Sequence, residues 1–281
     1  MMKKYFKNLP IHLILIFVVV ISLFPFLWLL STALKGSGED IFAYPPKLLP
    51  SSPTFDNFVG VWKQIPFLKY FWNSLIVSGW TVILNLLLSS LAAYPLARMS
   101  FKGKHFIFFA ILSTIMIPFQ AIMLPVYLIT LKLNLVDSIN ATLGYLGLIL
   151  PFSVSAFGIF LMRQAFLQIP KELEEAAIID GCNAWQIWWK VIMPLVKPSL
   201  AVLAIFVFIG SWGEFLWPSI VLTKKALYTL PLGVNDLQGM FSANWRYIAA
   251  GAIISTIPII IFFIAMQKYF VSGSTEGAVK G

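Results

Sequence analysis

The chain has 281 residues, of which 59% are hydrophobic and only 11% charged, and its mean hydropathy is +0.88. A soluble chain carries about 25% charged and about 45–50% apolar residues, so one water-soluble core could not hide this apolar surface. The composition therefore predicts an all-α membrane protein that crosses the lipid bilayer several times. One cysteine, two histidines and the absence of a G-x-x-x-x-G-K-[ST] run exclude a disulfide framework, a zinc triad and a P-loop. The net charge of +9 comes from residues that flank apolar runs, so we expect no nucleic-acid partner.

Six stretches between charged residues have the length of a membrane span, which takes about 20 mostly apolar residues. Five have no charged residue, and the fifth in chain order contains only Glu214. Three lysines precede the first stretch, but its apolar part is longer than that of a signal peptide, so we expect an uncleaved anchor. The six predicted spans are residues 8–34, 70–97, 106–131, 138–162, 198–223 and 247–267.

The distribution of Lys and Arg predicts the orientation. With the N-terminus inside, the cytoplasmic segments hold twelve of these residues and the outer segments eight, and six spans place both termini in the cytoplasm. The predicted organisation is an N-terminal segment with the first span, a Pro-rich outer loop, a core of five spans with a long cytoplasmic loop, and a cytoplasmic tail. These parts are residues 1–34, 35–73, 74–267 (with the loop at 163–197) and 268–281.

The cytoplasmic loop contains signals for two short helices. Pro170 suits the first turn of a helix, and three glutamates follow it where the helix dipole favours negative charge. Gly181 suits the left-handed residue that ends a helix, and Asn183 suits the cap of a second helix over residues 184–193, which we expect Pro194 to end.

The first of these helices has a surface suited to a partner protein. Leu173, Ala176, Ala177 and Asp180 fall at helical spacing on one side, and the alanines let another surface come close. The alternative is an amphipathic helix that lies on the bilayer, which would carry Lys and Arg on its polar face, whereas this helix begins with acidic residues.

The same loop resembles a known family. Glu175-Ala176-Ala177, Gly181 and the run Val191-Ile192-Met193-Pro194 match the E-A-A-x3-G-x9-I-x-L-P loop of binding-protein-dependent ABC importer permeases, with Val191 for Ile and Met193 for Leu. The resemblance implies the type I permease fold of these importers. It also implies that the loop docks into a cytoplasmic ATPase dimer. The positions expected to couple to the ATPase are Glu175, Ala176, Ala177, Asp180, Gly181 and Pro194.

The end of the chain is similar to one branch of that family. Residues 270–281, F-V-S-G-S-T-E-G-A-V-K-G, resemble the ending of maltose-type carbohydrate permeases. Residues 53–57 and Asn73-Ser74 also resemble this branch. The resemblance implies a subunit of a bacterial or archaeal inner-membrane sugar importer, paired with a second, homologous permease. Its other partners would be an extracytoplasmic solute-binding protein and the ATPases, which would bind ATP and Mg²⁺. We expect no cofactor, no metal and no catalytic residue in this chain, and the sequence does not name the sugar.

Polar residues inside the predicted spans are candidates for contact with the solute. Glu214 is an intramembrane acid, which is costly and usually faces a cavity or a partner, and Trp212 and Trp217 flank it. Asn85 and Gln120 are further candidates for the pathway. The alternative for each is structural: a contact with the second permease, outer water or an interhelical hydrogen bond.

Three other functions remain open from sequence. One is a permease of the same family for a non-sugar solute. Another is an ion-coupled secondary carrier, which would show buried ionisable pairs or an inverted repeat of broken helices. The third is a membrane-embedded enzyme, which would need clustered His, Asp or Glu, and no such cluster is apparent in the sequence.

Overall fold

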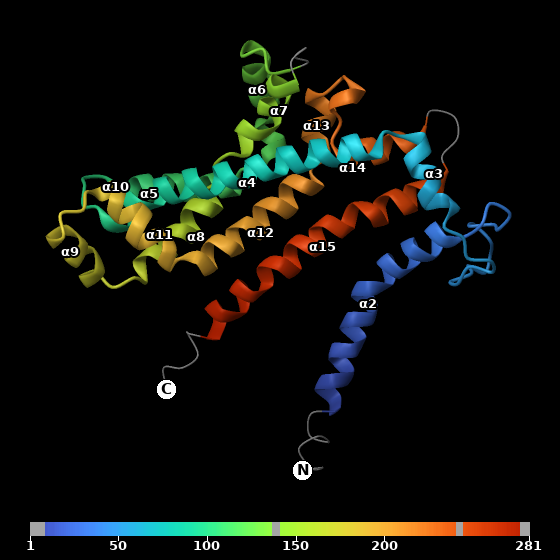
Figure 1. The fold of residues 1–281 in the computed structure, drawn as a ribbon, viewed down its shortest axis with the longest axis horizontal. Helices are drawn as coiled ribbons and strands as arrows, with labels where there is room; N and C mark the ends of the chain where they lie inside the picture. The colour runs from blue at the N-terminus through green and yellow to red at the C-terminus, as the bar shows by residue number, and fades with distance from the viewer. Residues whose placement is uncertain (1–8, 137–140, 240–243, 276–281) are drawn as a thin grey trace. The chain divides into compact units, whose positions relative to one another are not determined.

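The computed structural model describes residues 9–136, 141–239 and 244–275 (Figure 1). Within these ranges the chain is helical, with one isolated antiparallel bridge between Lys35 and Pro53 and no strand. The chain divides into two compact units, residues 1–68 with 233–257 and residues 69–232 with 258–281. The predicted all-helical class is therefore confirmed for the described residues.

The first unit joins the end of α2 (Leu9–Leu34) to α3 (Asp56–Gln64) and the start of α15 (Trp245–Thr275). The Asn57 side-chain amide donates to the carbonyls of Ala33 and Lys35, both at 2.8 Å, which closes the end of α2. A Cβ on Gly60 would lie 2.5 Å from the Tyr247 ring, so only glycine allows α3 to approach α15 this closely. The segment predicted as an outer loop therefore contains a helix and a buried polar joint.

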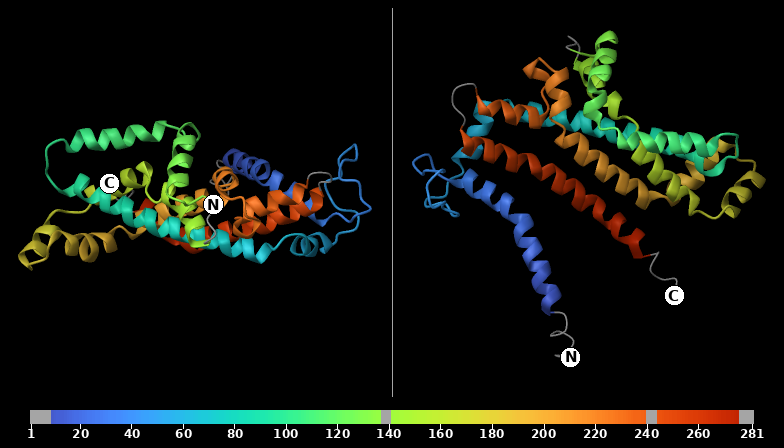
Figure 2. Two further views of the ribbon diagram at one scale, coloured as in Figure 1. Left: turned by 90° about the horizontal axis from the view of Figure 1, so that it is seen from above. Right: turned by 180° about the vertical axis from the view of Figure 1, so that it is seen from behind.

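The second unit is built around α4 (Phe67–Arg98), α8 (Ala156–Leu167) and α12 (Lys197–Gly213), which lie together in Figures 1 and 2. Buried side chains from these helices, among them Ala93, Met162, Phe166 and Leu203, form one core. A second core gathers around Trp217 and includes Val77 and Leu148. The first residues of α4 fall inside the stretch that we predict as outer loop.

Three helices are long and apolar enough to cross a membrane, Ile11–Leu34, Phe67–Arg98 and Trp245–Tyr269, and up to three bent helix pairs could add one span each. Of the six predicted stretches, the first, second and last are therefore single helices. The apolar residues of α2 from Ile11 to Leu27 are mostly exposed, as expected for a helix that faces lipid.

The other three predicted stretches are not single helices, which corrects the expectation of unbroken spans. The helical run Lys104–Met116, made of α5 (Lys104–Ser113) and η1 (Thr114–Met116), meets α6 (Phe119–Lys132) at 102°, a turn visible in Figure 2. Pro118 lacks an amide hydrogen, and the residue before it, Ile117, is extended (φ −89°, ψ 112°). α7 (Ala141–Ile149) and η2 (Leu150–Phe152) meet α8 at 55°.

The fifth predicted stretch breaks at its carboxylate. α12 ends at Gly213, Glu214 is extended (φ −67°, ψ 123°), and α13 runs over Leu216–Val221. Three short elements follow: η4 (Lys225–Leu227), α14 (Leu230–Asn235) and η5 (Asp236–Gln238). Glu214 thus lies at a junction between helices and not within a continuous one.

The loop over residues 163–197, which we predict to be cytoplasmic, forms short helical elements beyond the C-terminal end of α4 (Figure 1). The first, α9, is Glu172–Ile179. The predicted second helix comprises α10 (Ala184–Gln186), a π-helix η3 (Ile187–Ile192) and α11 (Met193–Leu195). It therefore continues past Pro194, which corrects the expectation that this proline ends the helix. Val196 leaves the helical conformation, and α12 starts at an angle of 82°.

Candidate functional site

The start of α9 follows from its sequence. The helix begins at Glu172, two residues after Pro170, and its first turn contains Glu172, Glu174 and Glu175. These carboxylates lie at the positive end of the helix dipole. Gly181 has φ +80°, a left-handed conformation that favours glycine, and ends this element as predicted. Asn183 and Gln186 then form a capping box, each side chain accepting from the other residue's amide at 2.9 Å.

One face of α9 is exposed and carries both charge and apolar surface. We call Glu172, Glu175, Ala176 and Ile179, spaced at i, i+3, i+4 and i+7, the outer face of α9. All four are exposed, and Ile179 is 86% exposed. Together with the neighbouring Ile178, which is 61% exposed, it forms an exposed apolar patch, and Ile179 is a residue that sequence reasoning missed. Asp180, Gly181 and Pro194 are also exposed.

The opposite side of α9 packs on the protein itself. Ala177 is only 7% exposed and belongs to the core formed with α4, α8 and α12. This placement differs from the predicted face, which grouped Ala177 with Ala176. In this structure Ala177 holds α9 against the rest of the second unit, and Ala176 is the alanine that faces outward.

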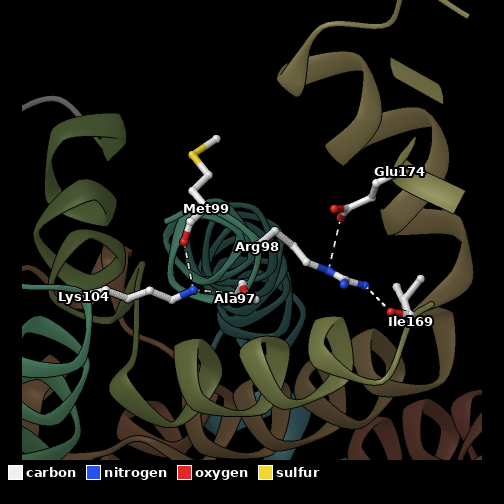
Figure 3. A network of polar contacts seen from close by, with 6 residues as sticks. All are labelled: Ala97, Arg98, Met99, Lys104, Ile169 and Glu174. Atoms are coloured by element: carbon white, nitrogen blue, oxygen red, sulfur yellow. Dashed lines mark hydrogen bonds and ion pairs between the residues drawn. The ribbon is translucent and has the colours of Figure 1, made fainter. Parts of the chain in front are cut away.

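A polar network joins α9 to the end of α4 (Figure 3). Arg98, the last residue of α4, donates from Nη2 to the carbonyl of Ile169, and its Nε lies 3.1 Å from Oε1 of Glu174. The two side chains are 4% and 15% exposed. Burial raises the pKa of the Glu174 carboxyl above its ordinary value, although the positive charges of Arg98 and Lys171 act in the opposite direction. Sequence reasoning missed this pair, because the partners are 76 residues apart in the chain.

A second feature of this unit is a partly open cavity of about 300 Å³ lined by residues of α4, α7, η2, α8, α12 and α13. This volume lies at the lower end of the range for pockets that hold small ligands. Its wall is mostly apolar, with a few polar groups. Those groups are Thr81, Asn85, Ser155, Ser211, Glu214 and Thr229.

Glu214 and Trp217 have structural contacts at the cavity wall. Glu214 accepts through Oε1 from the backbone amide of Trp217 at 3.0 Å, which satisfies a free amide at the start of α13. The Trp217 side chain is fully buried, donates from Nε1 to the carbonyl of Gly147 at 3.0 Å, and meets the Phe119 ring edge-on at 5.5 Å. Both residues thus hold the cavity wall in shape.

Asn85 is also tied into the wall. Its Nδ2 donates to the carbonyl of Phe152 at 2.9 Å, and its Oδ1 accepts from Ser89 at 3.2 Å and from Ser155 at 3.4 Å.

By contrast, Thr229 is 4% exposed and its hydroxyl has no hydrogen-bond partner among the described residues. A buried hydroxyl without a partner costs free energy, so a ligand that bonds to it would be favoured. A lone threonine carries no sequence signal, and our sequence reasoning missed it.

Two of the predicted pathway residues lie elsewhere. Trp212 is buried against Phe71 and Phe208, with ring centroids 5.7 and 5.4 Å apart, and does not line the cavity. Gln120 is exposed at the start of α6. The cavity therefore brings together Asn85, Glu214 and Trp217. The last residues of the predicted tail, 276–281, lie outside the described residues.

Comparison with known proteins places these features in context. Residues 85–275 match the family model described as "Binding-protein-dependent transport system inner membrane component". The chain is 39% identical to the arabinooligosaccharides transport system permease protein AraQ of Halalkalibacterium halodurans, over 94% of both chains. It is 36% identical to the trehalose transport system permease protein SugB of Mycobacterium tuberculosis, again over 94% of both. A solved bacterial ABC transporter for the import of the acidic polysaccharide alginate contains a similar chain, with a TM-score of 0.79, 26% identity, and coverage of 95% of this chain and 97% of that one.

Proposed function

Because this chain belongs to the family of inner membrane components of binding-protein-dependent transport systems, we propose that it is a membrane-spanning permease subunit of an ATP-driven carbohydrate importer. The relatives named for sugar transport support the solute class. The observation within the molecule that carries the proposal is the exposed acidic and apolar outer face of α9, which suits a groove on another protein.

The membrane arrangement that we propose has six spans, with both termini in the cytoplasm. α2, α4 and α15 each form one span, and the bent regions around α5–α6 and α7–α8 form two more. The sixth is α12, the longer half of the third bent pair, continued by α13. Non-helical backbone at membrane depth is tolerated where it is buried in protein or lines a water-filled cavity, and the break at Glu214 lines a cavity. The outer segment over residues 35–73 and the tail over residues 268–281 then lie on opposite sides of the membrane.

The proposed partners follow from this arrangement. A cytoplasmic ATPase dimer binds the outer face of α9 together with Asp180 and Gly181, with Glu175 as its charged contact, and holds the ATP and Mg²⁺. A second permease subunit completes the pathway, and an extracytoplasmic binding protein delivers the solute. Closure of the ATPases moves α9, and the spans switch between inward-facing and outward-facing states.

Two glycines offer a matched test of the docking surface. Gly181 and Gly103 both have positive φ, +80° and +82°, and a Cβ on either would meet nothing within 4 Å. A side chain at either position therefore has a similar backbone cost, about 1–2 kcal/mol. Only Gly181 adjoins the outer face of α9.

We expect Gly181→Leu to abolish ATP-driven uptake by the complete transporter in proteoliposomes, with the chain still inserted in the membrane. Gly103→Leu should keep most of the uptake. Equal uptake by the two variants would refute the docking assignment, and uptake by the wild type without an ATPase would favour a secondary carrier instead.

For the solute we propose a contact in the cavity. Glu214 and the free Thr229 hydroxyl can bond to sugar hydroxyls, and the exposed rings of Phe157 and Phe206, 5.4 Å apart at the cavity wall, can cover the apolar face of a sugar ring. Thr229→Val keeps the shape but removes the hydroxyl, so it should raise the sugar concentration needed for half-maximal uptake. An unchanged concentration for Thr229→Val and for Glu214→Gln would show that the solute is bound elsewhere.

A further inference from the structure

Arg98 contacts both the segment before α9 and α9 itself. Its Nη2 donates to the carbonyl of Ile169, ahead of α9, and its Nε lies 3.1 Å from Glu174 on the inner side of the helix (Figure 3). The Nε–Oε1 contact does not have hydrogen-bond geometry, so it acts through charge. α9 has eight residues, and Arg98 therefore links a short helix to the end of a helix of 32 residues.

The burial of this pair makes each partner depend on the other. Both side chains are more than four-fifths buried, so the loss of one leaves an uncompensated charge where water cannot easily reach it. Such pairs are weak evidence for stability, because desolvation offsets much of their attraction. Their geometry is nevertheless restrictive: Arg98 has a hydrogen-bond acceptor before α9 and an ion-pair partner on α9, which limits how that segment can tilt.

α4 connects this point to the cavity. Arg98 lies 13 residues after Asn85 on the same helix, a distance of about 20 Å at 1.5 Å per residue. Thr81 and Val77, one and two turns further, also line the cavity. A displacement of α9 that is passed to Arg98 therefore acts on the helix that forms one wall of the cavity.

We propose that Arg98 is a positioning residue for coupling, because it holds the inner side of α9 against the end of α4. A force that the ATPases apply to the outer face of α9 then moves α4 together with α9 and does not simply tilt α9. This inference rests on the proposed function, since the force on α9 comes from the proposed ATPase dimer. It assigns to Arg98 and Glu174 a role distinct from docking, because neither belongs to the outer face.

Lys104 provides a matched control. Its ammonium group donates to the carbonyls of Ala97 and Met99, at 3.1 and 2.8 Å, so it caps the same end of α4 (Figure 3). Lys104→Met removes a positive charge from this helix end but leaves the contact between Arg98 and α9 in place. Arg98→Gln removes the charge and the contact.

The experiment uses the complete transporter in proteoliposomes and measures solute imported per ATP hydrolysed, with the amount of co-purified ATPase as a check on docking. We expect Arg98→Gln to lower this ratio about three- to tenfold, the range of coupling changes seen for single substitutions, while the ATPase still co-purifies. Lys104→Met should leave the ratio unchanged. Glu174→Gln should lower it less than Arg98→Gln, because Arg98 keeps its hydrogen bond to the carbonyl of Ile169 and so still holds the segment before α9.

A spin label at position 178, which is exposed on α9 but lies outside the outer face, reports whether Arg98 holds α9 in place, in a Cys182→Ser background. Its mobility should rise in Arg98→Gln and stay the same in Lys104→Met. An unchanged ratio and unchanged label mobility in Arg98→Gln would overturn the proposal, as would an equal loss in Lys104→Met. If Arg98→Gln does not accumulate in the membrane, the solute-to-ATP ratio and the label mobility are measured in Arg98→Lys and Glu174→Gln instead. Unchanged values in both of these variants would overturn the proposal. Wild-type uptake that needs no ATP would instead refute the proposed function.

Discussion

Gly158 lies at a close contact between α8 and α4 beside the cavity. A Cβ at this position would lie 2.6 Å from Ser89 Oγ, 2.8 Å from Ser155 Oγ and 3.0 Å from Asn85 Oδ1. Real Cβ atoms essentially never come within 3.0 Å of another heavy atom, and the hydroxyls of Ser89 and Ser155 both donate to Asn85 Oδ1 in one network. Gly158→Ala must therefore push this network apart.

The size of the effect follows from the contacts. Overpacking of a methyl group costs about 1–3 kcal/mol. Two lost hydrogen bonds add about 1–3 kcal/mol. The better helix propensity of alanine returns about 1 kcal/mol. We expect a net loss of about 1–5 kcal/mol in the free energy of unfolding.

Thermal unfolding of the purified chain in mild detergent tests this expectation. Gly79 is a matched control, since it also lies inside a helix, α4, and a Cβ there would meet nothing within 4 Å. Gly79→Ala should unfold at or above the wild-type temperature and Gly158→Ala well below it. If Gly158→Ala is as stable as Gly79→Ala, the close approach of α8 to α4 is wrong.

Three further outcomes are expected. Trp217→Phe leaves the Gly147 carbonyl without its donor and should cost about 1–3 kcal/mol by the same unfolding assay, whereas no change would contradict the buried hydrogen bond. Asn57→Ala removes the donor to two carbonyls at the end of α2 and should speed proteolysis of the segment between α2 and α3, and an unchanged rate would show that this joint is dispensable. Because burial raises the pKa of Glu174, the folded state takes up its proton at a higher pH than the unfolded state. The wild type should therefore gain thermal stability relative to Glu174→Gln as the pH falls through this raised pKa, and a parallel pH dependence of the two proteins would contradict it.

Local signals in the sequence predicted local structure well. The left-handed Gly181, the cap at Asn183 and the acidic first turn of α9 depend on neighbours within a few residues, so they could be read directly. The family also followed from the motif around Glu175, and the sugar-importer class followed from residues 270–281, residues 53–57 and Asn73-Ser74.

The remainder depended on contacts that are distant in the chain. Two contacts determine which face of α9 points inward: Ala177 packs in the core, and Glu174 pairs with Arg98 of α4. The residue spacing within the loop predicts neither contact. The break at Glu214 was missed because one carboxylate in an apolar run gives the same sequence pattern whether it lies inside a helix or between two helices. Thr229 became a candidate only when the fold left its hydroxyl alone at the cavity wall.

The bond between Glu214 and the Trp217 amide has a consequence for any guest in the cavity. Oε1 already serves as acceptor for the first turn of α13. A solute hydroxyl that displaces this amide exchanges one donor for another, so the gain in affinity is reduced by what the helix loses. Binding of a solute in the cavity and the order of the first turn of α13 would then be energetically linked. A bound solute would therefore change the backbone conformation or mobility at the start of α13.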